Sequence, residues 1–439
     1  MELRDLIVTP IVLILVYAGA FFIRPWVTDE VNRKYFLPAL TVRVIGALAV
    51  GFIYQFYYGG GDTFNYHTHG SRHIWEAFME NAGNGIRLFF SSGDHPQGVF
   101  KYSRQIWYFG DPQSYFVVRV SAFFDLFTYS SYSATAVLFS VLSFTGAWLM
   151  FQTFYRLHRD FHRWIAISCL FIPTVFFWGS GIFKDTITLA TLGVALFCLS
   201  RLFVEKKFSV VAMVGLIFSV WVLFSIKKYI LLCFMPVILL WIFSMGLKKI
   251  RSRVLKILII PIAMVPVMFL IYFTVLKIGE DDARYNLDQL AKTAQITAYD
   301  IRYGWGARTG EGSGYTLGEL DGSWQSMARL APAAINVSLF RPYLWEIGSP
   351  LMILSALESF VFLGLTLFVL YKSRLTIFGG LQQPEVILCL GFSIIFAFAV
   401  GVSTYNFGSL SRYKIPLLPF YAMALGFLYY HSKKFKTTE

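Results

Sequence analysis

Residues 6–23 read LIVTPIVLILVYAGAFFI, an uncharged stretch that is long enough to cross the hydrocarbon core of a membrane as one helix. No small-residue cleavage pattern follows it, so it is not typical of a removable targeting peptide. Apolar stretches of similar length recur along the chain. They predict about eleven spanning helices, near residues 6–24, 37–57, 133–155, 163–178, 184–203, 208–225, 229–246, 255–276, 350–371, 385–402 and 412–430.

The composition agrees with this interpretation. Of the 439 residues, 56% are hydrophobic and 14% are charged, and the mean hydropathy is +0.59. A water-soluble domain carries about 25% charged residues, so this chain has too few charges to cover a surface in water. We expect an all-helical polytopic membrane protein that forms a single transmembrane domain over residues 1–439. The four cysteines lie within apolar stretches and form no CxxC pair, which predicts buried residues rather than disulfides or a zinc site.

The net charge of +13 is also explained by a membrane, and we expect no nucleic-acid partner. Basic residues gather in short segments between apolar stretches, as they do on the cytoplasmic side of membrane proteins. Counting through the expected spans puts the C-terminus and five such segments on that side: residues 156–163, 205–207, 248–256, 372–374 and 433–436. Lys227 and Lys228 are the exception, because they fall on the outer side.

The same count places two long loops, residues 58–132 and 277–349, together on the outer face, and the N-terminus with them. Within the first loop, Tyr115 to Tyr129 is apolar but contains Arg119 and Asp125. A charge at the centre of a span costs about 2.5–3.5 kcal/mol on insertion scales. We therefore expect a helix that lies at the membrane interface. If residues 113–130 span instead, the first loop moves to the cytoplasm.

The first loop opens with Tyr57-Tyr-Gly-Gly-Gly-Asp62-Thr-Phe-Asn-Tyr-His67-Thr-His69. Three glycines let the backbone turn sharply and leave the following carboxylate open to a ligand, which suits Asp62 as a general base. A helix C-cap followed by a solvated turn explains the same letters. His67, His69 and His73 with Asp62 are candidate metal ligands, although their spacing fits neither a strand nor a helix throughout.

A very short outer turn carries a second candidate site. Residues 173–186 read PTVFFWGSGIFKDT and place Lys184 and Asp185 at the start of a span, where the helix dipole favours an anion. Charged residues at membrane depth beside aromatic residues and glycines are typical of a cavity lining. The alternative is an ordinary ion pair worth about 1 kcal/mol or less.

Two further segments contain candidate site residues. The glycine density of the second loop suggests a mobile lid, although glycine-rich loops are also simply flexible. The glycine-rich second loop contains Arg302, Arg308 and Arg341, although Arg341 and Glu346 are close enough in sequence to pair with each other. Residues 409–419 read SLSRYKIPLLP and bring Arg412 and Tyr413 to the entry of the final span. These side chains could grip a phosphate or anchor the helix at the interface.

Taken together, these landmarks resemble the GT-C superfamily of membrane glycosyltransferases, and most closely its protein-mannosyltransferase-like branch. The matching residues are Gly60-Gly61-Asp62 with Tyr66-His67, then Arg119, then Pro173 with Asp185, and finally Arg412-Tyr413 with Pro416 and Pro419. They are scattered over residues 1–205 and 405–430. The chain departs from the family pattern by an extra span before the acidic loop, by a single second acid that follows a lysine, and by the lack of a large soluble C-terminal domain.

The resemblance implies sugar transfer from a polyprenyl-phosphate donor, with membrane lipid around it, at the outer face of a bacterial inner membrane. Asp62 and Asp185 would be catalytic, and His67, Arg119, Lys184, Arg341, Arg412 and Tyr413 would bind substrate. Whether a divalent metal ion takes part is open, with Asp62, Asp185 and His67 as its candidate ligands. Two alternatives remain: a polysaccharide polymerase or O-antigen-type ligase that uses arginines of the second loop, and a lipid flippase or transporter.

Overall fold

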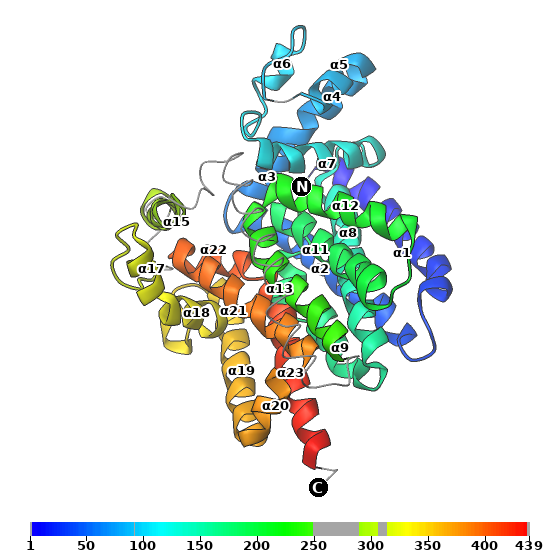
Figure 1. The fold of residues 1–439 in the computed structure, drawn as a ribbon. Coiled ribbons are helices and arrows are strands. Elements are labelled where there is room, and N and C mark those ends of the chain that lie inside the picture. The colour runs from blue at the N-terminus through cyan, green and yellow to red at the C-terminus, as the bar shows by residue number, and fades with distance from the viewer. Residues whose placement is uncertain (1, 92, 249–288, 306–313, 437–439) are drawn as a thin grey trace. The chain divides into compact units, whose positions relative to one another are not determined.

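The computed structural model describes residues 2–91, 93–248, 289–305 and 314–436. These residues form helices and connecting turns, with no β-strand among them (Figure 1). The chain packs as two compact units. Unit 1 is Met1–Ser200 with Phe208–Lys227, and unit 2 is Arg201–Lys207 with Lys228–Glu439.

Seven helices in the described ranges are long and apolar enough to cross a membrane, which supports a helical, multi-pass membrane protein. Each coincides with a span expected from the sequence. They are Leu3–Val27 (α1), Arg33–Phe56 (α2), Tyr132–Leu157 (α8), Lys184–Val204 (α11 with a π-helical end), Lys228–Leu247 (within α13), Pro350–Leu381 (α19 to α20) and Pro384–Thr404 (α21).

The other four expected spans are not confirmed, and the count of eleven stays a prediction. Residues 163–178 are broken into α9 (His162–Leu170) and α10 (Pro173–Trp178), because the residue before a proline avoids the helical region. The stretch 208–225 is α12 (Val210–Ile226), with 17 residues. Residues 412–430 are divided between α22 (Phe407–Tyr413) and α23 (Leu417–Lys436), and 255–276 lies outside the described residues.

Unit 1 is built around α8, which contacts α1, α2, α7, α9 and α11. The backbones of α8 and α11 approach closely at Gly146 and Gly193, where a β-carbon on either residue would overlap the backbone of the other helix. Small residues at such crossings let membrane helices pack through their backbones. The remaining helices of the first loop are α3 (Asp62–Tyr66), a π-helix (His67–Ser71), α4 (Arg72–Glu80), α5 (Ala82–Phe89), α6 (Phe100–Ser103) and α7 (Pro112–Thr128).

The contacts at the two ends of α8 identify which segments lie at each end of unit 1. At its first residue, the hydroxyl of Tyr132 lies 2.7 Å from that of Thr63 in the first loop. Near its last turn, the Tyr155 hydroxyl donates to Asp29, and Arg156 lies over the ring of Phe197 late in α11. The 26 residues of α8 rise about 39 Å, close to the full thickness of a bilayer. The first loop and the basic segment 156–163 therefore lie at opposite ends of this unit.

Helix α7 contains the apolar stretch that carries Arg119 and Asp125. Its N-cap Asp111 contacts Lys184 at the start of α11, and Asp125 near its end accepts a hydrogen bond from Thr135 at the start of α8. Both ends of α7 therefore contact helix beginnings, and α7 does not carry the chain to the other end of unit 1. Figure 1 shows α4, α5 and α6 beyond α7 at this end. The interfacial position of α7 stays a prediction.

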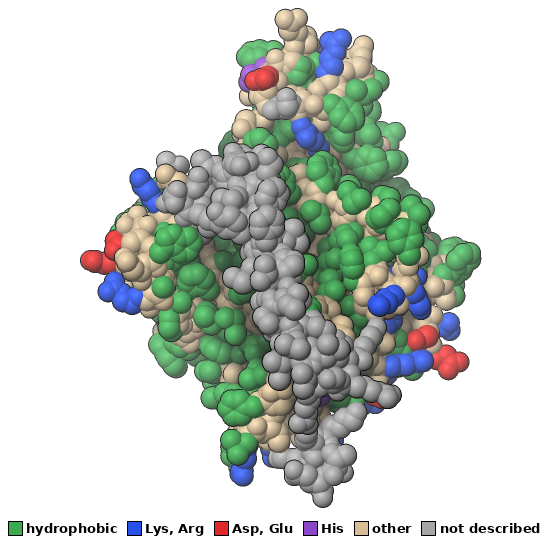
Figure 2. Space-filling model, viewed as in Figure 1, with side chains coloured by type: hydrophobic (Ala, Val, Ile, Leu, Met, Phe, Trp, Pro, Cys, Tyr) green, Lys and Arg blue, Asp and Glu red, His purple; other side chains and the backbone are tan. Residues whose placement is uncertain are grey.

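The surface of unit 1 also matches a membrane protein. Many large apolar side chains are exposed on its spanning helices and α12, among them Ile14, Phe22, Ile45 and Val211. Figure 2 shows hydrophobic side chains over much of this unit, with charged side chains gathered toward its ends.

Unit 2 is arranged around α21 and α23, which pack against each other; α21 also contacts α13, α15 and α18, and α23 contacts α19 and α20. Its second-loop helices are α15 (Leu290–Tyr299), a π-helix (Asp300–Trp305), α17 (Trp324–Arg329), α18 (Ala331–Phe340) and a 3-10 turn (Leu344–Glu346). The end of the glycine-rich stretch is fixed to α21, because the N–H of Tyr315 donates to the carbonyl oxygen of Tyr405. Arg308 lies outside the described residues.

The two ends of unit 1 give a topological prediction. The cysteine added in Asp94→Cys, at an exposed turn of the first loop, should react with a membrane-impermeant maleimide in intact spheroplasts of an expression host. Arg163→Cys, exposed at the start of α9, should react only after permeabilisation. The unmodified protein is the control, because its four native cysteines are buried. Labelling of both variants in intact spheroplasts, or of Arg163→Cys alone, would contradict the expected topology.

Candidate functional site

Asp62 lies directly after a glycine elbow. Helix α2 ends at Phe56, and Gly59, Gly60 and Gly61 take φ angles of +68°, +136° and +125°, which side-chain-bearing residues rarely adopt. The elbow turns the chain so that Asp62 is the first residue of α3. The Tyr108 hydroxyl donates to Oδ1 of Asp62 at 3.2 Å, and the carboxylate is half-buried.

A second carboxylate lies close to Lys184. Asp111 caps α7 by accepting from the Gln113 N–H, and the Lys184 ammonium donates to its Oδ2 at 3.3 Å. Burial opposes ionisation of Asp111, but Lys184, Ser114 and the Gln113 N–H together hold its pKa below the ordinary carboxyl value. Lys184 also interacts electrostatically with Asp62, so these three side chains form one group.

Asp185 is paired with a lysine that the sequence had left unexplained. The ammonium of Lys227, which follows α12, donates to Oδ1 of Asp185, and both side chains are buried. Lys227 also acts electrostatically on Lys184. Lys227, which broke the predicted pattern of cytoplasmic basic segments, thus neutralises Asp185. We call Asp62, Asp111, Lys184, Asp185 and Lys227 the charged cluster.

The structure places the other predicted site residues of unit 1 apart from this cluster. His67 is fully buried, and its Nε2 lies 3.2 Å from Oδ1 of Asp125. Asp125 is also fully buried and accepts hydrogen bonds from Ser71 at 2.6 Å and from Thr135 at 2.8 Å. His67 is thus part of an internal polar network.

Arg119 contacts other residues of the first loop. Arg119 is half-buried, lies 4.8 Å from the ring centre of Tyr115, and donates to the carbonyl oxygen of Ser91. Within the described ranges, no three His, Cys, Asp or Glu side chains form a group that could hold a metal ion. Asp62, Asp185 and His67 therefore do not form a shared ligand set in this structure.

Unit 2 holds the remaining predicted site residues. Nε of Arg341 donates to both carboxylate oxygens of Glu346, at 3.1 and 3.0 Å, and the guanidinium lies 5.3 Å from the ring centre of Phe407. The ion pair considered from the sequence is thus present. Arg412 and Tyr413 are half-buried at the end of α22.

Sequence reasoning missed four residues of unit 1: three that form or contact the charged cluster, and Arg43. Tyr108 and Asp111 carry no local signal, because their partners lie far away in the chain. Lys227 had a signal, since it broke the pattern of basic segments. Arg43 also had one: it lies within an expected span, is fully buried, and donates to Ser143, which in turn donates to the carbonyl oxygen of Gly179 before Lys184. An arginine inside a membrane span is by itself a reason to look for a function.

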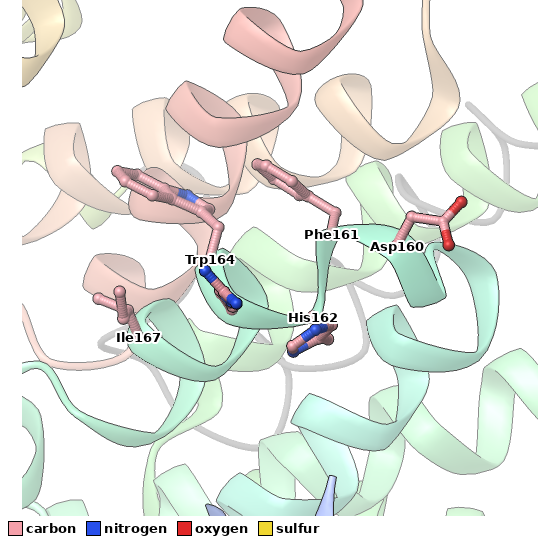
Figure 3. A pocket seen from close by; sticks show the side chains of 6 residues that line it. Asp160, Phe161, His162, Trp164 and Ile167 are labelled. Atoms are coloured by element: carbon pink, nitrogen blue, oxygen red, sulfur yellow. The ribbon is translucent and has the colours of Figure 1, made fainter. Parts of the chain in front are cut away.

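A surface hollow occurs elsewhere in unit 1. It is lined by Asp160, Phe161, His162, Arg163, Trp164 and Ile167 (Figure 3). These residues follow the last turn of α8, at the opposite end from the first loop, so the hollow contains none of the predicted site residues. Comparison of the chain with family models, curated proteins and solved structures found no match.

The Asp111–Lys184 pair predicts a pH-dependent stability. Because the folded state lowers the Asp111 pKa, its ionised carboxylate stabilises the fold at pH values above the ordinary aspartate pKa of about 3.9. That contribution is lost as the pH falls through the lowered pKa. Asp111→Asn keeps an oxygen for the Gln113 N–H and removes the charge. We expect a stability loss of about 1 kcal/mol or less at pH 7, since Asp111 is 46% exposed, and a shrinking difference below pH ~4.

Thermal melting in detergent between pH 7 and pH 3 measures this difference. Asp94→Asn, an exposed carboxylate of the same loop, is the matched control and should follow the wild type throughout. A stability difference for Asp111→Asn that does not change with pH would refute the electrostatic explanation.

The Asp185–Lys227 pair predicts a compensating double variant. Removing one partner of a buried ion pair leaves an unpaired charge and typically costs about 3–5 kcal/mol, whereas replacing both by apolar residues of similar size is often neutral. We expect Asp185→Leu and Lys227→Met each to lower the melting temperature strongly. The double variant should recover most of the loss. A double variant as unstable as the worse single variant would show that the two side chains do not act as a pair.

Proposed function

We propose that this protein is a glycosyltransferase that moves a sugar from a polyprenyl-phosphate donor to an acceptor hydroxyl at the outer face of a bacterial inner membrane. The observation that carries the proposal is the charged cluster at the first-loop end of unit 1. A lipid-linked sugar presents its phosphate and its reactive carbon at the membrane surface. A carboxylate that can accept a proton and an ammonium group that can bind a phosphate, at the end of a bundle of membrane-length helices, suit that chemistry.

In the proposed step, Asp62 accepts the proton of the acceptor hydroxyl as its oxygen forms a bond to the anomeric carbon of the donor sugar. The bond from that carbon to the phosphate oxygen breaks, and polyprenyl phosphate leaves with the electron pair. Lys184, which interacts with Asp62 electrostatically, stabilises the charge on the departing phosphate. Tyr108 orients the base through its hydrogen bond to Asp62.

Asp185 takes a different role from Asp62 in this proposal. Its carboxylate is buried and bound to Lys227, so it positions the start of α11, and with it Lys184. Arg412 and Tyr413, which belong to unit 2, stay predicted substrate-binding residues. The expected location, a bacterial inner membrane with the C-terminus in the cytoplasm, belongs to the proposal as well.

The polymerase or ligase alternative depends on Arg302, Arg308 and Arg341. Arg302 donates to the carbonyl oxygen of Tyr315, and Arg341 is paired with Glu346. These contacts give two of the three arginines a part in fixing their own loop. The observations therefore favour the charged cluster as the site of chemistry.

The proposal predicts that Asp62→Asn loses activity while the fold is kept. General-base assistance supplies about 10²–10⁴-fold, so transfer should fall at least about a hundredfold. The amide retains an oxygen for the Tyr108 hydroxyl, so the melting temperature in detergent should stay close to that of the wild type. The measurement is the release of polyprenyl phosphate from a radiolabelled polyprenyl-phosphate sugar pool in vesicles that contain the protein.

Asp94→Asn is again the control, because it removes a carboxylate from the same loop outside the charged cluster. It should turn over at the wild-type rate. Turnover of Asp62→Asn at that rate would rule out Asp62 as the base. Movement of labelled lipid across the vesicle membrane without any covalent product would favour a flippase or transporter.

A further inference from the structure

Trp107 is an exposed aromatic residue in a turn whose other large apolar side chains are buried or half-buried. Its side chain is 66% exposed, although Ile106 and Phe109 on either side of it in the chain are buried. The backbone N–H of Trp107 donates to the backbone carbonyl oxygen of His69 at 3.1 Å. The turn is thus anchored on both sides, and the indole is held outward at a fixed position rather than at a loose loop tip.

One face of this indole is already covered. The ring of His69 lies parallel to it, with 4.9 Å between the ring centres and 19° between the planes. Burial, together with the neighbouring His73 and Arg72, lowers the pKa of His69. The exposed area of Trp107 therefore belongs to its opposite face and its edges. The pair forms a small rigid platform with one open aromatic face.

The platform is connected to Asp62, the base of the proposed reaction, through Tyr108. Tyr108, the residue after Trp107, donates its hydroxyl to Asp62, and the rings of Tyr108 and Tyr66 pack 4.9 Å apart. Tyr66 is followed directly by the π-helix that carries His69. The segment 62–69 and the turn 106–109 therefore hold Asp62 and the open face of Trp107 in one local structure.

The open face fits a sugar ring. An aromatic face is negatively polarised and attracts weakly positive hydrogens, which a pyranose presents as a row of C–H groups along one side. Its hydroxyl groups then point outward around the edge, where one of them can reach a base. We propose that Trp107, stacked on His69, is a subsite that binds a sugar ring of a carbohydrate acceptor and directs a hydroxyl to Asp62. This proposal rests on the proposed glycosyl transfer and names its acceptor as a carbohydrate.

The test separates binding from transfer. Full-length protein in nanodiscs, labelled with a fluorophore, is applied to an array of oligosaccharides from bacterial cell envelopes. The wild type should bind a subset of them. Trp107→Ala should lose at least about tenfold in apparent affinity for that subset, because an aromatic stacking contact contributes on this scale. Trp107→Phe keeps a ring and should retain part of the binding.

Two variants serve as controls. Trp26→Ala removes an even more exposed tryptophan, 91% exposed at the far end of α1, and should bind like the wild type. Asp62→Asn should also bind like the wild type, because the base is not needed for stacking. Equal loss in Trp26→Ala and Trp107→Ala would point to a general effect of exposed tryptophans at the membrane interface and would overturn the subsite.

The remaining outcomes distinguish the two proposals. Absence of binding by the wild type, or unchanged binding by Trp107→Ala, overturns the subsite even if sugar transfer is measured. Binding that depends on Trp107, in a protein that transfers no sugar from a lipid-linked donor, supports the subsite and overturns the proposed transfer. Where transfer is measured, Trp107→Ala should raise the KM for the bound oligosaccharide about tenfold and leave kcat within about twofold.

Discussion

The structure of unit 1 depends on the pairing of charges among membrane helices. A charge that faces lipid or a dry protein interior is costly unless an opposite charge or several hydrogen bonds accompany it. Asp185 on α11 meets this condition through Lys227 at the end of α12, and Lys184 meets it through Asp111 at the start of α7. Two adjacent residues thus connect the beginning of α11 to two other helices.

The same constraint shapes α7 and its surroundings. Asp125 is enclosed by Ser71, Thr135 and His67, and Asp5 at the start of α1 accepts from the Ser131 hydroxyl at 2.7 Å and from the Ser133 N–H at 3.2 Å. These contacts bind the first turns of α1 and α8 to the first loop. The loop is therefore part of the packed end of unit 1, and Asp62 is attached to a rigid frame.

The sequence predicts the helices of this protein better than its site. Seven long apolar stretches are helices of membrane length, because uninterrupted apolar sequence in lipid allows little else. Asp62, Lys184 and Asp185 could be found because they stand beside glycines and helix ends. Tyr108, Asp111 and Lys227 could not be assigned as partners, because their contacts span 46, 73 and 42 residues of sequence. Asp125 shows a second limit of prediction from sequence. The sequence predicts that its charge would be costly in a membrane span, but it does not identify His67 as the side chain that accompanies this charge.

The arrangement of the charged cluster explains why Asp62 is a better candidate for the general base than Asp185, although the resemblance implies a catalytic role for both. A general base must reach a substrate proton, so it has to be partly open to solvent. Asp62 is half-buried and lies after a glycine elbow that removes side chains from its approach. Asp185 is enclosed and its charge is satisfied by Lys227. The Asp185–Lys227 pair holds the start of α11, which carries Lys184, and Lys184 acts electrostatically on Asp62. Asp62 is therefore the carboxylate that we propose as the base.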